Sequence, residues 1–185
     1  MSQETIKSDL IVFSHIKWVD PLQRLHHLVH RYAEDRRIFF VERPQVVDNL
    51  NAHLEIEDRG SIAIVTPYIP SLLKTSEKHD EIRSLLDELI EDEKIHQFHL
   101  WYSDAVAYKY SHHLVPTLLI YDGFSATKTE DHELEKSLID RADLILCDQS
   151  DRAIKSWEQD FETVRNLERW ALRNKIQQFV HMSTL

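Results

Sequence analysis

Short apolar runs alternate along the chain with longer segments in which apolar residues recur on one side only. Residues 9–15 form a continuous run rich in β-branched and aromatic side chains, which is typical of a strand buried on both faces. Runs of the same kind occupy residues 37–42, 98–103, 117–123 and 143–150. Because strands buried on both faces occur in parallel sheets covered by helices, these runs predict one central sheet.

The segments between these runs predict helices. After Pro21, apolar residues follow helical spacing as far as Tyr32, and residues 75–96 are amphipathic in the same way, with Ser76 as a candidate N-cap. Shorter helical segments lie around residues 104–112, 131–142 and 150–159. This alternation predicts an α/β fold with a doubly wound, mostly parallel, Rossmann-like sheet and helices on both faces.

Two parts of the chain carry other patterns. Residues 53–67 predict a weaker strand, a turn at Gly60 and a second strand that Pro67 ends. The tail predicts one more helix with no strand after it, from the spacing of Val164, Leu167, Trp170, Ala171 and Phe179. We therefore expect a Rossmann-like domain over 1–160 and a C-terminal helical extension over 161–185.

Charge and composition exclude several functions. The chain has 22 Lys and Arg residues against 32 Asp and Glu residues, which argues against a nucleic-acid partner because such proteins usually present a basic face. Its two glycines, Gly60 and Gly123, stand alone, so no glycine-rich loop for a dinucleotide or a nucleotide phosphate is present. With a single cysteine, Cys147, a polar start and no run long enough to cross a bilayer, the expected location is the cytoplasm.

The candidate functional residues are those that follow the predicted strands, because ligands of open parallel sheets bind outside the carboxyl ends of the strands. The polar and aromatic residues at these ends are Ser14, His15, Trp18, Glu42, Arg43, Tyr68, Tyr102, Ser103, Asp104, Asp122, Asp148, Gln149 and Ser150. His15 is a candidate general base, and hydrogen bonding to a loop backbone is the alternative. Asp122 and Asp148 are candidates to orient a hydroxyl or bind a metal, although capping the next helix is favoured.

Two further kinds of site are disfavoured. His26 and His30 have i, i+4 spacing, but no glutamate lies between them as in a zinc-binding H-E-x-x-H motif, so a solvated histidine face is favoured and we expect no metal or cofactor. A Ser/His/Asp hydrolase is disfavoured because no G-x-S-x-G elbow is present and Ser14 is adjacent to His15.

Motifs near the start of the chain are shared with a known family. They are F-S-H-x-x-W at residues 13–18 and Q-R-x-x-H-L at residues 23–28, followed by FFVERP. The segments LLDELIEDEKIHQFHLWYS, TLLIYDG and LEKSLIDRADLILCDQSDRAIKSW continue the likeness in register to about residue 157. With these motifs the chain resembles the N-terminal, acceptor-side domain of bacterial GT-B glycosyltransferases of the GT4-like type. The first pair of motifs is fairly specific, whereas the strand segments alone are not.

The resemblance implies two Rossmann-like domains across a cleft, with the acceptor in the N-terminal one and the nucleotide-sugar in the other. It implies that the cleft residues are Ser14, His15, Trp18, Gln23, Arg24, Tyr102 and Asp122, to which the strand ends add Asp104 and Asp148. His15 and Asp122 are the candidates to position the acceptor or to act as the general base. The expected ligand is a glycan acceptor or a nucleotide-sugar, and transfer would need a partner subunit that carries a GT-B C-terminal domain.

The departures from the family pattern leave two alternatives open. Leu25 replaces the usual proline, residues 123–126 replace an acidic M-D-E, and Asp148 and Gln149 replace two glycines. A structural or regulatory protein that keeps the fold would act through protein contacts, for example as a homodimer through the tail that bears Trp157 and Trp170. A small metal-dependent phosphatase or hydrolase that uses Asp122 and Asp148 is the third hypothesis.

Overall fold

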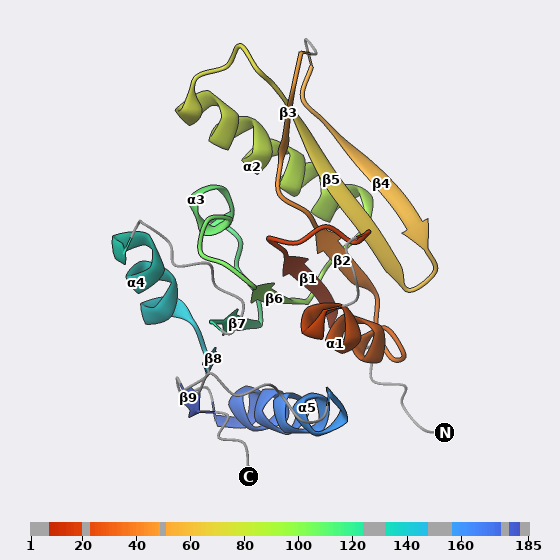
Figure 1. Ribbon diagram of the computed structural model, residues 1–185, viewed down its shortest axis with the longest axis vertical. Helices are drawn as coiled ribbons and strands as arrows, with labels where there is room; N and C mark the ends of the chain where they lie inside the picture. Colours follow the sequence, from red (N-terminus) through yellow and green to blue (C-terminus); the bar gives the residue numbers. More distant parts are fainter. Residues whose placement is uncertain are drawn as a thin grey trace.

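The computed structural model describes residues 8–19, 23–48, 51–123, 132–147, 157–174 and 178–181. Within these residues the chain forms one sheet flanked by helices (Figure 1). The chain order is β1 (Asp9–Phe13), α1 (Arg24–Tyr32), β2 (Ile38–Val41), β3 (Gln45–Val47), β4 (His53–Arg59), β5 (Ile62–Pro70), α2 (Thr75–Asp92), β6 (Phe98–Tyr102), α3 (Tyr108–Ser111), β7 (Leu118–Asp122), α4 (His132–Arg141), β8 (Leu144–Cys147), α5 (Trp157–Asn174) and β9 (Gln178–His181). The predicted α/β fold is confirmed.

The sheet is parallel except for one hairpin. The order of its strands is β3-β5-β2-β1-β6-β7-β8-β9, and β4 pairs with β5 in the antiparallel direction. The other described pairs are all parallel. From β1 the chain proceeds to β2 on one side, and from β6 to β7 on the other, so the winding reverses between β1 and β6. This reversal is the topological switch point of the sheet.

Alternation along the strands divides the core between the two faces of the sheet. In β1, Leu10 and Val12 pack in one apolar cluster with residues of α1 and α5. Ile11 and Phe13 belong to a second cluster, to which α2, α3 and α4 contribute. Successive side chains of a strand point to opposite faces, so the continuous apolar runs reflect helices on both sides of the sheet.

The β4–β5 hairpin confirms the turn predicted at Gly60 but not the predicted end of its second strand. Gly60 has a φ of +77°, a conformation that glycine adopts without a steric penalty. However, β5 continues through Pro67 to Pro70. Its first residues pair with β2 and its last three with β3, and Pro67 lies between these two stretches. The missing N–H of Pro67 therefore removes no hydrogen bond to β2 or β3.

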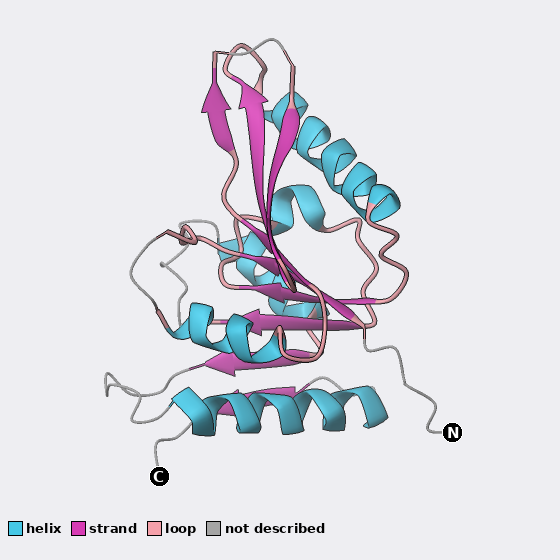
Figure 2. Cartoon of the chain, turned by 90° about the vertical axis from the view of Figure 1, so that its right-hand side faces the viewer, coloured by secondary structure: helices cyan, strands magenta, loops and turns pink. Residues whose placement is uncertain are grey.

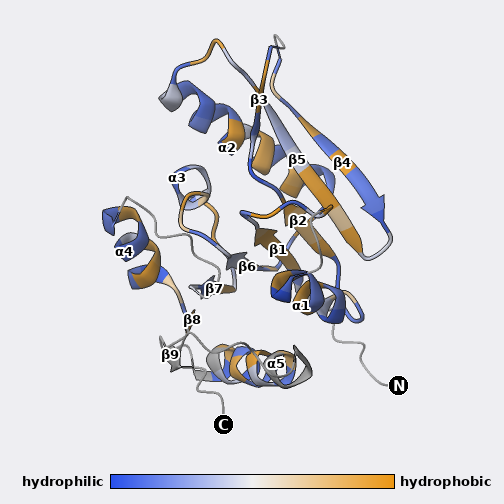
Figure 3. Cartoon of the chain, viewed as in Figure 1, coloured by the Kyte–Doolittle hydropathy of each residue, from blue (hydrophilic) through white to orange (hydrophobic). Residues whose placement is uncertain are grey.

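The hairpin, β3 and α2 extend together beyond the rest of the sheet (Figures 1 and 2). β3 was not predicted, because its three residues are half-buried or exposed and form no apolar run. β4 lies at the edge of the sheet and is largely hydrophilic (Figure 3). Charged side chains on an edge strand oppose pairing with another chain.

Helix α2 begins and ends differently from what the sequence predicts. It starts at Thr75, so Ser76 lies inside the helix and not at its cap. The backbone N–H of Lys74 donates to the Glu77 carboxylate at 2.8 Å, which closes the first turn. After the helix Lys94 takes a left-handed φ of 53°, a position that glycine usually occupies.

The tail forms a helix and then a strand. The first described side chains of α5 to face inward, Phe161 and Val164, belong to the apolar cluster on the α1 face of the sheet. β9 follows and pairs with β8 in parallel, with Phe179 opposite Ile145. The predicted helix is confirmed, whereas the prediction of no further strand is wrong. Phe179 was assigned to the helix because its spacing from Val164 also fits helical periodicity.

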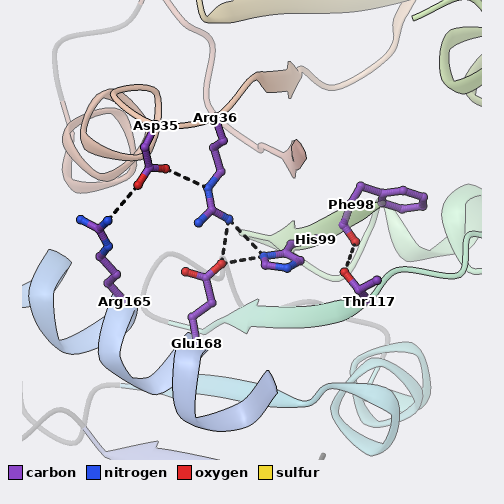
Figure 4. A network of polar contacts seen from close by, with 7 residues as sticks. All are labelled: Asp35, Arg36, Phe98, His99, Thr117, Arg165 and Glu168. Atoms are coloured by element: carbon purple, nitrogen blue, oxygen red, sulfur yellow. Dashed lines mark hydrogen bonds and ion pairs between the residues drawn. The ribbon is translucent and has the colours of Figure 1, made fainter. Parts of the chain in front are cut away.

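A buried network of charged residues joins α5 to the sheet and to the loop before β2 (Figure 4). Glu168 accepts hydrogen bonds from Arg36 at 2.8 Å and from Nδ1 of His99 at 2.6 Å. Asp35 pairs with both Arg36 and Arg165, at 3.3 and 2.9 Å. Glu168 and His99 are each 3% exposed, so the Glu168 carboxylate is held by protein groups in place of water.

None of the helices in the described part of the chain combines the length and the apolar character that crossing a bilayer requires.

Candidate functional site

The candidate site lies at the switch point, where β1 and β6 end side by side. His15 follows β1, and Ser103 follows β6. Nδ1 of His15 lies 2.9 Å from the hydroxyl oxygen of Ser103, and the backbone N–H of His15 donates to the same oxygen at 3.1 Å. Ser103 is fully buried, so this contact fixes the orientation of the His15 ring across the two strand ends.

Burial and the nearby aspartates shift the pKa of His15 in opposite directions. Burial is the largest influence and lowers the pKa of His15 below its ordinary value of 6.5. The charges of Asp104 and Asp122 raise the pKa, and that of Arg43 lowers it, but the net direction is downward. His15 is therefore neutral near pH 7, the state in which a histidine accepts a proton.

Two arginine–aspartate pairs flank His15. Arg24, the first residue of α1, contacts Asp122 at the end of β7 at 2.6 Å, and the two side chains are 6% and 0% exposed. Arg43, after β2, contacts Asp104, after β6, at 2.7 Å. Asp122 therefore forms a buried ion pair within the protein. This pairing joins residues from two distant parts of the chain.

Ser14 and Trp18 follow β1 but serve the local fold. The Ser14 hydroxyl donates to the carbonyl of Ile16 at 2.9 Å. The backbone N–H of Trp18 donates to the Glu42 carboxylate at 2.7 Å. The Trp18 ring is 8% exposed and packs against Phe40 with 5.0 Å between ring centroids. Trp18 was predicted to contact a ligand, but this loop turns its ring into the core.

Of the other predicted residues, Tyr102 is also buried. Its ring stacks on Phe13 with 5.1 Å between centroids, and its hydroxyl lies 2.7 Å from that of Ser111. Tyr102 is the last residue of β6 and points to the α3 face, so Ser103 and Asp104 are the residues that reach the site. Gln23 is exposed directly before α1. Asp148 lies outside the described residues.

The histidines of α1 do not all lie on a solvated face, as the sequence predicted, because they differ in burial. His26 is fully buried, and its ring lies 5.2 Å from that of Trp18. His30 is exposed, and its ring is also 5.2 Å from Trp18. In the part of the chain that the structure describes, no group of three or more His, Cys, Asp or Glu residues is arranged to hold a metal ion.

Sequence reasoning placed the ends of β1, β2, β6 and β7 close to where they lie, whereas Tyr68, predicted to follow a strand, lies inside β5. It did not identify the partners within the site. Ser103 was visible as a polar residue after a buried run, yet its contact with His15 depends on the adjacency of β1 and β6. The Arg24–Asp122 pair spans 98 positions, and no local pattern links its members. Both contacts follow from the sheet order.

The comparisons with known proteins identify the fold. No protein-family model matches the chain. No curated protein sequence matches it significantly. A structure described as "Trehalose-6-phosphate from E. coli bound with UDP-2-fluoro glucose" is similar with a TM-score of 0.51 and 14% identity, over 85% of this chain and 43% of that one. An α,α-trehalose-phosphate synthase (UDP-forming) from Burkholderia xenovorans, in complex with glucose-6-phosphate, is similar with a TM-score of 0.51 and 12% identity, over 78% of this chain and 41% of that one.

In its fold, the chain resembles half of a GT-B glycosyltransferase. The chain spans less than half the length of either structure that it matches. The resemblance to GT-B enzymes is thus confirmed for the fold, while the GT4-like type stays a prediction.

Proposed function

We propose that the chain is the acceptor-side half of a GT-B glycosyltransferase of the GT4-like type and works in the cytoplasm. It would bind a glycan acceptor at the switch point, and the nucleotide-sugar would be held by a C-terminal-type half on a partner. The observation that carries the proposal is the His15–Ser103 contact across β1 and β6, with an arginine–aspartate pair on each side. In open α/β sheets, this is the place where ligands bind.

His15 is the group in this site that suits proton removal. In a direct transfer, the acceptor oxygen attacks the anomeric carbon of the donor sugar, the nucleotide leaves, and the acceptor proton must be taken up. When Nδ1 of His15 carries a proton and donates it to Ser103, Nε2 is unprotonated and can accept the acceptor proton. The lowered pKa keeps the ring neutral before the reaction.

The two aspartates have supporting roles in this proposal. Asp122 is fully buried and neutralised by Arg24, so it suits the positioning of that arginine better than proton transfer. Arg43 is 47% exposed while its partner Asp104 is 4% exposed. The guanidinium of Arg43 is therefore the charged group of these pairs that is most open to a ligand.

A thermal-shift screen against glycans and nucleotide-sugars tests the proposal. A ligand at one hundred times its Kd stabilises the folded state by about 2.7 kcal/mol. For a domain of this size the unfolding midpoint then rises by about 5–10 °C. We expect His15→Ala to abolish transfer when a GT-B C-terminal-type half is supplied, and His132→Ala, on the exposed start of α4, to leave it unchanged. Equal turnover of the two variants would contradict the role of His15.

A second candidate function, a structural protein that acts as a homodimer, is favoured by apolar side chains exposed on α5. Trp170 and Leu172 are 37% and 40% exposed. If the exposed Leu172 side of α5 joins two copies, light scattering will show a dimer that Leu172→Glu converts to a monomer. A monomeric parent chain would contradict this candidate.

A further inference from the structure

A cavity of about 250 Å³ adjoins the candidate site between β3, the start of α2 and the loop after β6. Its walls are largely apolar. Ile69, Ile82 and Tyr110 line it and are buried, whereas Val46 and Val106 line it and are 58% and 37% exposed. Exposed apolar side chains beside a mainly apolar cavity indicate a site for an apolar group, because a ligand would remove this surface from water.

The ionisable residues of the cavity lining are mainly basic. They are Arg43, Lys78 and His79, with Asp104 as the acidic one. The Asp104 carboxylate already has partners within the protein, because it accepts hydrogen bonds from Arg43 at 2.7 Å and from the backbone N–H of Val106 at 2.8 Å.

Lys78 supplies a positive charge that no described residue neutralises. Its ammonium group forms no hydrogen bond or ion pair with any residue that the structure describes. Burial lowers the pKa of His79, so its ring is neutral near pH 7. The lining therefore carries one net positive charge, that of Lys78, in a chain whose formal net charge is −10.

We propose that this cavity binds the apolar segment of an anionic ligand whose phosphate or carboxylate pairs with Lys78 and Arg43. The proposal rests on the proposed function in one respect, namely that this ligand is the acceptor. Ser14 and Asp104 line the cavity, and Ser14 precedes His15, so a hydroxyl elsewhere on the ligand can reach His15. Neither a bare sugar nor inorganic phosphate offers both the apolar segment and the charge.

Three probes separate these contributions in a titration of the full chain by calorimetry. Phenyl phosphate carries both parts, inorganic phosphate only the anion, and benzyl alcohol only the apolar group. We expect the Kd of phenyl phosphate to be at least about tenfold lower than that of either fragment. The reason is that its two joined parts lose translational freedom only once on binding, whereas separate fragments each lose it. Amide resonances of Lys78, His79 and Val106 should shift on binding.

Two variants assign the contacts. Lys78→Gln should raise the Kd of phenyl phosphate about five- to tenfold and leave that of benzyl alcohol unchanged. Val46→Ser should weaken both of these probes to a similar extent. Lys136→Gln is the matched control, because Lys136 is an exposed lysine of α4, and it should change neither. The unfolding midpoint of each variant verifies that it folds.

The outcomes distinguish the cavity from the transferase. Phenyl phosphate that binds no better than its fragments, or equally well to Lys78→Gln, overturns the cavity proposal and leaves glycan binding at His15 untouched. Phenyl phosphate that binds as expected to a chain without affinity for any glycan or nucleotide-sugar overturns the acceptor assignment while the cavity stands.

Discussion

Replacing Glu168 by glutamine should destabilise the protein, because its carboxylate is the centre of the buried network in Figure 4. The Glu168 side chain is 3% exposed, and the Arg36 side chain is 7% exposed. Glu168→Gln keeps the size of the side chain but removes its charge. The guanidinium of Arg36 then remains buried with Asp35, at 3.3 Å, as its carboxylate partner.

The magnitude follows from the cost of an uncompensated buried charge. Removing one partner of a buried ion pair costs about 3–5 kcal/mol. Because Arg36 retains Asp35 and glutamine still accepts a hydrogen bond, we expect the lower end, about 3 kcal/mol. For a chain of this length this is a fall of about 6–12 °C in the unfolding midpoint.

The same substitution should change how stability depends on pH. Burial alone would raise the pKa of Glu168, but the hydrogen bond from His99 and the charge of Arg36 outweigh it, so the pKa lies below its ordinary value. A lowered pKa in the folded state means that the unfolded state binds more protons in acid. The contribution of Glu168 to the free energy of unfolding is thus fully present above its pKa in the unfolded state, about 4.3. It is lost as the pH falls through its lower pKa in the folded state.

Urea unfolding of the parent chain and of Glu168→Gln between pH 7 and pH 3 measures both effects. The difference in the free energy of unfolding should be greatest near neutral pH and shrink below about pH 4. Glu162→Gln is the control, since Glu162 lies exposed on the same helix. If Glu168→Gln proves no more destabilising than Glu162→Gln, α5 does not depend on this network.

Three further predictions concern single sites. In an NMR titration the His15 ring should titrate below its ordinary pKa of 6.5, because burial lowers it; a midpoint above 6.5 would refute the electrostatic account of the site. Arg24→Met should cost about 3–5 kcal/mol in urea unfolding by removing the guanidinium that pairs with the buried Asp122 carboxylate, and adding Asp122→Asn should restore most of the loss; an unrescued double variant would disprove this explanation. Lys94→Gly should stabilise the chain by about 0.5–1 kcal/mol, because Lys94 has a left-handed φ; a loss of stability would show that the side chain has another role.

The parts of the fold that could be predicted are those that the local pattern of apolar and polar residues determines. β1, β2, β6, β7 and β8 are continuous apolar runs because helices cover both faces of the sheet. β3 has three residues and no such run, so its pairing with β5 arises from tertiary contacts. β9 was missed because Phe179 also fits the period of the preceding helix.

For the candidate site, the sequence indicated which residues follow the strands but not where their side chains point. Tyr102 and Ser103 are adjacent, yet one lies in the α3 core and the other contacts His15. The path of the chain after β1 turns Trp18 inward. Such directions depend on the pleat of each strand and on loop geometry, neither of which residue types alone specify.

The most direct test of the proposed acceptor site is an NMR titration of the ¹⁵N-labelled chain with a panel of glycans and nucleotide-sugars. The account predicts that at least one ligand binds saturably and shifts the amides of His15, Ser103 and Gly123, at the ends of β1, β6 and β7. The same ligand should leave those resonances unchanged in His15→Ala. Saturable binding that maps to another face of the sheet, or no binding by any member of the panel, would contradict the account.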